Sequence, residues 1–281
     1  MAPFPRAHGP TAAVQRRTGR RLPVVVFSHG AHSHQGDHTV MVQELAGHGY
    51  AVVTVAHHHD TYTVFPDGRV AVPRPDVPMP PGDFAADLRF VLDCVELLAA
   101  GHNPDAGRRK LPAGLPGSLD PRRIGAFGWS KEGTATACAT LADDRIRAGL
   151  SLDGPDADEP AALRRPGPAV HDDDRRVHPG HRSRGRRVLV AAARPAAEHP
   201  GPGRRPSLVR RQRGAVPQVA KMFGWSEQEL QDVIGTLDPV EAVKIQQAYS
   251  LAFFFDEHLR HRRGHLLDGP SPDFPAVVLL P

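Results

Sequence analysis

The chain has 281 residues, of which 40% are hydrophobic and 23% charged, so its apolar content suffices for the core of one α/β domain. It contains no run of about 18 apolar residues, which excludes a transmembrane helix and predicts no stable membrane insertion. The two cysteines, Cys94 and Cys138, lie in apolar helical patterns, which excludes a disulfide framework and a cysteine-built zinc site.

The first elements follow a Pro-, Gly- and Arg-rich stretch over 1–21, which we expect to be disordered. This stretch lacks the apolar region of a secretory signal, so the sequence as written predicts a cytoplasmic protein, or a secreted one if the N-terminus is truncated. Continuous apolar runs predict buried strands, and apolar residues at helical spacing predict helices. We expect strands over 22–27 and 50–56, and helices over 40–48 and 84–100.

The second half repeats this alternation up to residue 153. Strands are expected over 119–127 and 147–152, with a small-residue helix over 134–141 between them. A Ser-x-x-Glu capping box at Ser226 and an Asp-Pro start at Asp238 predict two helices near the C-terminus, the second reaching about residue 262. Strand–helix alternation predicts a single domain of α/β class over 1–281, with a mostly parallel central sheet flanked by helices.

Residues 155–215 differ in composition from the rest of the chain. They hold 14 of the 35 Lys and Arg residues but only 7 of the 31 Asp and Glu residues, so the remainder carries a formal net charge of −3. Within them, only 187–193 reads as a strand. The interpretations are a disordered insertion, a basic arm for nucleic acid, or a reading-frame error in GC-rich coding DNA. The absence of Lys and aromatic residues there argues against nucleic acid as a partner.

The sharpest chemical signal is Gly128-Trp129-Ser130 between a strand and a helix. Serine hydrolases place their nucleophile on such a tight turn, with backbone N–H groups aimed at the developing oxyanion. Here the N–H groups of Lys131 and of Ala31, after an earlier strand, are the candidate oxyanion donors. Asp153 ends the next strand, where the acid of a catalytic triad belongs; the alternative is a turn or capping aspartate.

Several segments in order resemble the platelet-activating-factor acetylhydrolase family, a lipase-like branch of the α/β-hydrolase superfamily. The matching stretches are 24–30, 44–53, 87–93, 123–130, 144–154 and 252–260. The resemblance implies an α/β-hydrolase fold and esterase chemistry on a small-molecule ester or lipid, without metal or cofactor. It also implies Ser130 as nucleophile and Asp153 as acid, with oxyanion donors at Ala31 and Lys131. His29 and Trp129, beside these positions, are then expected to contact the substrate; the alternative for His29 is a turn residue bonded to backbone.

The chain departs from the family at two places. Glu132 stands where the family has glycine, and we expect a Cβ forced into a glycine position to cost about 1–3 kcal/mol and to tilt the serine. The family's histidine would fall inside 155–215, where no matching loop is visible. His199 is the candidate among the histidines present, and His171, His178 and His181 are expected to be solvated. In a shifted frame, Pro206 would occupy the ancestral histidine position.

Other histidines admit a competing interpretation. His57, His58 and His59 with Asp60 could suggest a metal site, but adjacent side chains diverge, so we expect none. His258 and His261 are expected on the surface of the C-terminal helix. The sequence therefore predicts a serine carboxylic-ester hydrolase that forms an acyl-enzyme and whose activity is impaired if its catalytic histidine has been lost. The alternative is a catalytically dead hydrolase-fold protein that binds ligands.

Overall fold

The computed structural model describes residues 20–65, 67–152, 187–191, 221–222, 224–234, 237–254 and 265–277. Its centre is a five-stranded sheet in the order β2-β1-β5-β6-β7, in which every neighbouring pair is parallel. The strands are β1 (Leu22–Ser28), β2 (Ala51–Val55), β5 (Leu119–Trp129), β6 (Ile146–Leu152) and β7 (Arg187–Ala191). The predicted α/β class with a mostly parallel sheet is confirmed.

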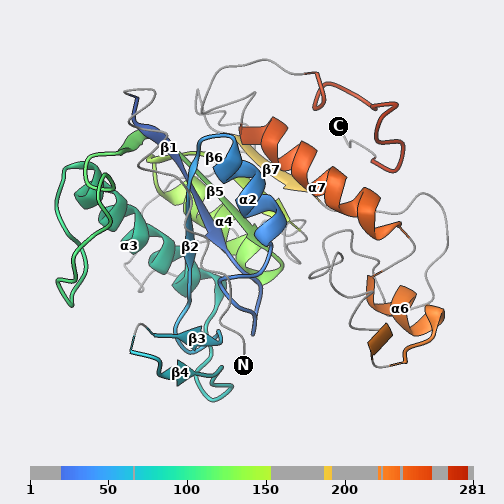
Figure 1. Ribbon diagram of the computed structural model, residues 1–281, viewed down its shortest axis with the longest axis horizontal. Coiled ribbons are helices and arrows are strands. Elements are labelled where there is room, and N and C mark those ends of the chain that lie inside the picture. The colour runs from blue at the N-terminus through green and yellow to red at the C-terminus, as the bar shows by residue number, and fades with distance from the viewer. Residues whose placement is uncertain are drawn as a thin grey trace, which may run out of the picture.

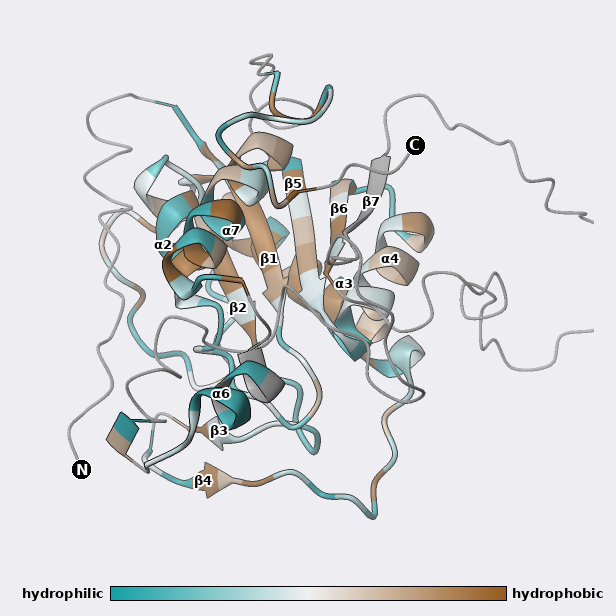
Figure 2. Cartoon of the chain, turned by 90° about the vertical axis from the view of Figure 1, so that its right-hand side faces the viewer, coloured by the Kyte–Doolittle hydropathy of each residue, from teal (hydrophilic) through white to brown (hydrophobic). Residues whose placement is uncertain are grey.

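Helices cover both faces of this sheet (Figures 1 and 2). One face carries α2 (Thr39–Gly47) and α7 (Pro239–Phe254), which contact each other, and the other carries α3 (Pro81–Ala99) and α4 (Lys131–Ala142). None of these helices, nor any other in the described part of the chain, is long and apolar enough to cross a membrane.

The alternation of side chains along β1 explains why both faces are buried. Val24 and Val26 belong to the hydrophobic cluster beneath α3 and α4, whereas Val25 and Phe27 belong to the cluster beneath α2 and α7. Successive residues of a strand point to opposite faces, so a strand covered on both faces reads as a continuous apolar run. This is the pattern on which the strand was predicted.

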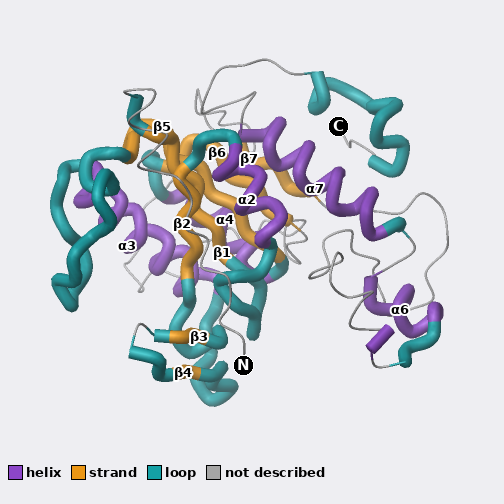
Figure 3. The backbone as a smooth tube through the Cα atoms, viewed as in Figure 1, coloured by secondary structure: helices purple, strands orange, loops and turns teal. Residues whose placement is uncertain are grey.

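Two smaller elements lie outside the central layers. The antiparallel pair β3 (Thr63–Val64) and β4 (Val70–Ala71) follows β2 at one end of the sheet (Figure 3). Helix α6 (Glu227–Ile234) begins at the predicted capping box, in which the Ser226 N–H donates to Glu229 Oε2 and the Glu229 N–H donates to Ser226 Oγ.

The Asp238 carboxylate caps α7 by accepting the N–H groups of Val240 and Glu241.

The structure differs from the sequence expectation around Ser130. Strand β5 runs two residues beyond 127, and α4 begins at Lys131 rather than at residue 134. The physical reason is the backbone of Ser130, which turns the chain from strand to helix within a single residue. At the other end, α7 is described to Phe254, and the expected continuation to residue 262 lies outside the described residues.

Within the unusual segment, the expected strand is confirmed as β7, which pairs with β6. The remainder of 155–215, and residues 1–19, lie outside the described part of the chain.

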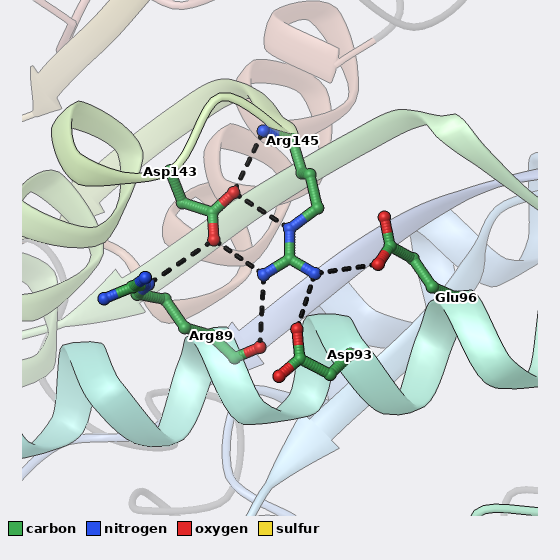
Figure 4. A network of polar contacts seen from close by, with 5 residues as sticks. All are labelled: Arg89, Asp93, Glu96, Asp143 and Arg145. Atoms are coloured by element: carbon green, nitrogen blue, oxygen red, sulfur yellow. Dashed lines mark hydrogen bonds and ion pairs between the residues drawn. The ribbon is translucent and has the colours of Figure 1, made fainter.

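An ion-pair network joins α3 to the turn between α4 and β6 (Figure 4). The Arg145 guanidinium donates to Asp143, Asp93 and Glu96, at 2.7, 2.6 and 3.0 Å respectively. Asp143 is only 8% exposed, and the hydrogen bond from Arg145 lowers the pKa of its carboxyl group. The network therefore fixes α3, and with it one face of the sheet, to the segment that leads into β6.

Candidate active site

The carboxyl ends of three neighbouring strands meet at one edge of the sheet. Ser28, the last residue of β1, is in register with Val55 at the end of β2 and with Gly128 near the end of β5. Residues that follow parallel strands emerge at the same edge. The segments after β1 and β2 and the turn after β5 are therefore neighbours, as the sequence predicted for 28–31 and 128–130.

Ser130 has an unusual backbone, with φ 57° and ψ −130°. A positive φ is uncommon for a residue other than glycine and costs of order 1–3 kcal/mol. Its carbonyl oxygen accepts the N–H groups of Gly133 and Thr134, and these bonds form the first turn of α4. The side chain is half-buried. Ser130 is therefore a strained residue at the N-terminus of α4.

Two glycines allow this turn to close. A Cβ on Gly128 would lie 2.2 Å from the Glu132 carbonyl oxygen, and a Cβ on Gly133 would lie 2.8 Å from Ser151 Oγ and 3.1 Å from the Leu152 carbonyl oxygen. The requirement for a small residue before the serine was predicted at Gly128. On the helix side, the glycine that meets β6 is Gly133, one position later than the family pattern implies.

Glu132 is accommodated differently from the sequence expectation. It lies in the first turn of α4 with a fully buried side chain, and it is absent from the described non-glycine residues with positive φ. The positive φ therefore lies at Ser130 and not at residue 132, and the expected tilt of the serine by the Glu132 Cβ stays a prediction.

The segment after β1 packs directly on the serine turn. A Cβ on Gly30 would lie 2.2 Å from Cε3 of Trp129, so the indole ring rests against the Gly30 backbone. Only glycine permits this approach, which brings Ala31 and the peptide of Lys131 to the same part of the sheet edge. Trp129 is partly buried, and its expected contact with substrate stays a prediction.

His29 is fully buried. Its Nδ1–H donates to the Gly30 carbonyl oxygen at 2.9 Å, as expected for a turn residue bonded to backbone. Burial lowers the pKa of this imidazole from 6.5 to about 4, so the ring is neutral at physiological pH. Its expected contact with substrate stays a prediction.

A hydrogen-bonded Ser–His–Asp chain lies beneath this segment, and the sequence analysis missed it. His57 Nδ1 lies 2.9 Å from Asp87 Oδ2, and His57 Nε2 lies 2.7 Å from Ser28 Oγ. In this arrangement Nδ1–H donates a hydrogen bond to the Asp87 carboxylate, and Nε2 accepts one from the Ser28 hydroxyl group. Ser28 and His57 have no exposed surface, so this chain ties β1, β2 and α3 together and offers no accessible hydroxyl. Ser28 is paired with Val55 at the end of β2, two residues before His57. Aligning the ends of the two predicted strands could have indicated the contact between Ser28 and His57.

Asp60 connects the segment after β1 to the serine turn. Its Oδ1 lies 3.2 Å from Nζ of Lys131, and its Oδ2 accepts the backbone N–H of His32 at 3.2 Å. The Lys131 ammonium also sits 4.6 Å from the centre of the Phe84 ring, a cation–π contact. The side chain of Asp60 is 6% exposed and that of Lys131 is 28% exposed, so the pair is only partly open to solvent.

The histidine cluster after β2 was considered as a metal site and expected not to be one. Both ring nitrogens of His57 are engaged by Ser28 and Asp87. Among the described residues, no group of three or more His, Cys, Asp or Glu side chains is arranged to hold a metal ion. Asp60, the acidic member of the cluster, is paired with Lys131.

The expected acid and histidine lie outside the described residues: Asp153, His199, His171, His178 and His181, together with Pro206, His258 and His261. The residue before Asp153 is nevertheless informative. Leu152 ends β6 in register with Trp129, and its carbonyl oxygen accepts the Ser130 N–H at 2.7 Å. The structure thus brings together Ser130, Lys131, Trp129, His29 and the segment of Ala31, and leaves the remaining roles as predictions.

Comparison with known proteins identifies similar chains. The sequence pattern of platelet-activating factor acetylhydrolase, isoform II, matches residues 10–65, which include β1, α2, β2 and the segments through Asp60. No curated protein sequence matches the chain.

Among solved structures, a ferulic acid esterase from Streptomyces cinnamoneus matches with 24% identity and a TM-score of 0.62, covering 98% of this chain and 85% of that one. Two further matches, AbyA5 and a 2,6-dihydroxy-pseudo-oxynicotine hydrolase, have TM-scores of 0.32, with 19% and 20% identity. They cover 49% and 47% of this chain and 32% and 30% of their own length. The esterase match shows a shared fold. The acetylhydrolase pattern is confined to residues 10–65, and the parallel sheet with helices on both faces agrees with the fold shared with the esterase.

Proposed function

We propose that the protein hydrolyses carboxylic esters through an acyl-enzyme on Ser130. The observation that carries this proposal is the positive φ of Ser130 at the direct passage from β5 to α4. Such a strained strand-to-helix turn exposes a serine hydroxyl above a parallel sheet and aims the first N–H groups of the helix at the reacting carbonyl. Strain of this kind persists where the surrounding structure enforces it, here through Gly128 and Gly133.

The reaction follows from this placement. Ser130 Oγ attacks the ester carbonyl carbon, and its proton passes to a histidine. The carbonyl oxygen becomes an oxyanion and accepts hydrogen bonds from the N–H groups of Ala31 and Lys131. The intermediate then collapses, the C–O bond to the alcohol breaks, and the histidine returns the proton to the leaving alkoxide. In the second half of the reaction, water attacks the acyl carbon and gives its proton to the histidine. The histidine then returns a proton to Ser130 Oγ, and the acid leaves.

Asp153 is the proposed acid of this triad. It directly follows Leu152, whose carbonyl oxygen is bonded to the Ser130 N–H, and this neighbourhood supports the assignment. His199 is the proposed histidine. A His199→Ala variant should lose about as much activity as Ser130→Ala, whereas His171→Ala should keep wild-type activity. Equal activities of the two histidine variants would refute the choice of His199.

The proposed substrates are small-molecule esters or lipids with a carboxylic ester bond. Platelet-activating factor acetylhydrolase acts, by its name, on an acetyl ester, so short p-nitrophenyl esters are the first probes. Replacing Ser130 by Ala should abolish turnover, because loss of a triad serine costs a factor on the order of a million in kcat. Unchanged hydrolysis in this variant would overturn the proposal.

A covalent probe separates the enzyme from a ligand-binding protein without activity. A fluorophosphonate reacts with an activated serine, and intact-mass measurement with peptide mapping locates the adduct. Labelling at Ser130 that is absent in Ser130→Ala supports the hydrolase. A chain that is folded, binds esters and is not labelled would instead be the catalytically dead alternative.

A further inference from the structure

We propose that Asp60 is a positioning residue that sets the separation of the two oxyanion donors, Ala31 and Lys131. The inference rests on the proposed function and adds a residue to it. Asp60 follows β2 and belongs to neither of the segments that carry these donors. Its carboxylate nevertheless contacts both of them, one oxygen for each.

The first contact fixes the segment after β1. Asp60 Oδ2 accepts the backbone N–H of His32 at 3.2 Å, and His32 is joined to Ala31 by a peptide bond. The His32 backbone has a positive φ of 53°. A strained residue needs an outside partner to stay in place, and the buried carboxylate provides one next to the donor Ala31.

The second contact fixes the first residue of α4. Asp60 Oδ1 lies 3.2 Å from Nζ of Lys131, whose own peptide N–H is the other proposed donor. The Phe84 ring supports the same ammonium at 4.6 Å from its centre. The side chain of Lys131 is therefore held at its end by a charge and a ring, at the first residue of α4.

Asp60 is itself held in place. Its N–H donates to the His57 carbonyl oxygen at 3.2 Å, and the His57 ring is fixed between Ser28 and Asp87. The side chain of Asp60 is 6% exposed, so water screens its contacts weakly. Because this carboxylate is held in place and contacts both donor segments, it constrains the distance between them.

This arrangement has a chemical consequence. An oxyanion hole works only when its donors lie about 2.7–3.1 Å from the oxyanion, and a misplacement of about 1 Å can cost a factor of about 100 in rate. Loss of the Asp60 charge should loosen Lys131 while leaving the proposed serine and triad intact. The effect should fall on stabilisation of the tetrahedral state and spare binding of the ester.

The test compares Asp60→Asn with Asp76→Asn, a matched loss of charge at the exposed Arg74–Asp76 pair. Two quantities are measured: the rate constant for fluorophosphonate labelling of Ser130, and the Ki of a trifluoromethyl ketone by competition against that labelling. The ketone forms a tetrahedral adduct whose oxygen occupies the oxyanion hole. For Asp60→Asn we expect labelling slowed about 10–100-fold and Ki raised by a similar factor. Asp76→Asn should match wild type.

A second variant covers the case in which Asp60→Asn does not fold. Lys131→Met keeps the peptide N–H and the packing length, removes the ammonium at a partly exposed side chain, and should show the same two changes. Wild-type Ki in the folded variants would overturn the inference, even with slower labelling, because a displaced oxyanion donor must weaken the tetrahedral adduct. If wild-type Ser130 is not labelled at all, the proposed function fails first, and the inference falls with it.

Discussion

The amide of Ser130 donates a hydrogen bond to the carbonyl oxygen of Leu152 across 2.7 Å. This bond joins the serine turn to the last residue of β6, the residue that precedes Asp153. The turn is thus anchored by the neighbouring strand as well as by its own helix. The strain of Ser130 is supported on two sides, and its conformation should respond sharply to changes in the residues packed beneath it.

Gly128→Ala should destabilise the protein and remove ester hydrolysis. The new Cβ would meet the Glu132 carbonyl oxygen at 2.2 Å and Thr136 Oγ1 at 2.5 Å, and the first of these is backbone that cannot rotate away. Overpacking of this kind costs about 1–3 kcal/mol. Urea unfolding followed by circular dichroism gives the loss in free energy of unfolding, and p-nitrophenyl acetate turnover gives the loss in activity.

Gly47→Ala is the control for this substitution. Gly47 ends α2, and an added Cβ there would meet no atom within 4 Å. Alanine should raise the free energy of unfolding by about 0.5–1 kcal/mol, because it restricts the unfolded chain and favours the helix. Equal destabilisation by the two substitutions would contradict the packing argument at Gly128.

The buried His29 predicts a stability that falls between pH 6.5 and pH 4. Burial lowers its pKa from 6.5 to about 4, so the native imidazole stays neutral while the unfolded one takes up a proton. Stability is therefore complete above pH 6.5 and decreases as the pH falls towards 4, below which both states are protonated. At about 1.4 kcal/mol per pKa unit, the interval corresponds to about 3 kcal/mol.

His29→Asn isolates this contribution. The Asn amide can donate to the Gly30 carbonyl oxygen as Nδ1–H does, but it does not titrate. The difference in free energy of unfolding between wild type and variant should shift by up to about 3 kcal/mol from pH 7 to pH 4, in the direction that favours the variant at low pH. His102→Asn, at an exposed histidine, should reproduce the wild-type profile. A constant difference for His29→Asn across this range would show that His29 is not buried neutral.

Arg145→Met should destabilise the protein at neutral pH and much less in acid. The substitution removes the guanidinium from Asp143, which is 8% exposed and keeps a longer ion pair with Arg89 at 3.5 Å; a buried polar group that loses a close partner costs about 1–3 kcal/mol. Arg145 lowers the pKa of the Asp143 carboxyl group. That stabilisation is present above the ordinary pKa of about 3.9 and is lost as the pH falls below it.

Urea unfolding at pH 7 and pH 3 checks this prediction, and the two proteins should converge in stability at the lower pH. Arg109→Met is the control, because its ion pair with Asp105 is exposed at the arginine and should contribute little. An equal loss for Arg145→Met at both pH values would mean that packing, and not the charge of Asp143, accounts for it.

The sequence predicted the elements that periodicity defines and the serine turn, but it missed the contacts that depend on register. β1 and β2 could be predicted because a strand covered on both faces has a continuous apolar sequence. The turn at Ser130 could be predicted from its place between a strand and a helix. Asp60 and Lys131 are 71 residues apart, and His57 and Asp87 are 30 apart. No local pattern links such residues; only the alignment of strand ends brings them together. Asp153 and His199 stay predictions.

The contact between Gly30 and Trp129 can be tested by pairing two substitutions. Gly30→Ala places a Cβ 2.2 Å from Cε3 and 2.4 Å from Cζ3 of the indole, so the ring or the segment of Ala31 must move, and we expect at least a tenfold loss in kcat/KM. Trp129→Leu vacates that space. The double variant should therefore lose less stability than the sum of the single variants, with a coupling of about 0.5–3 kcal/mol measured by urea unfolding of the four proteins. Strictly additive losses would mean that the two residues do not touch, and the close approach of the segment after β1 to the serine turn would then be wrong.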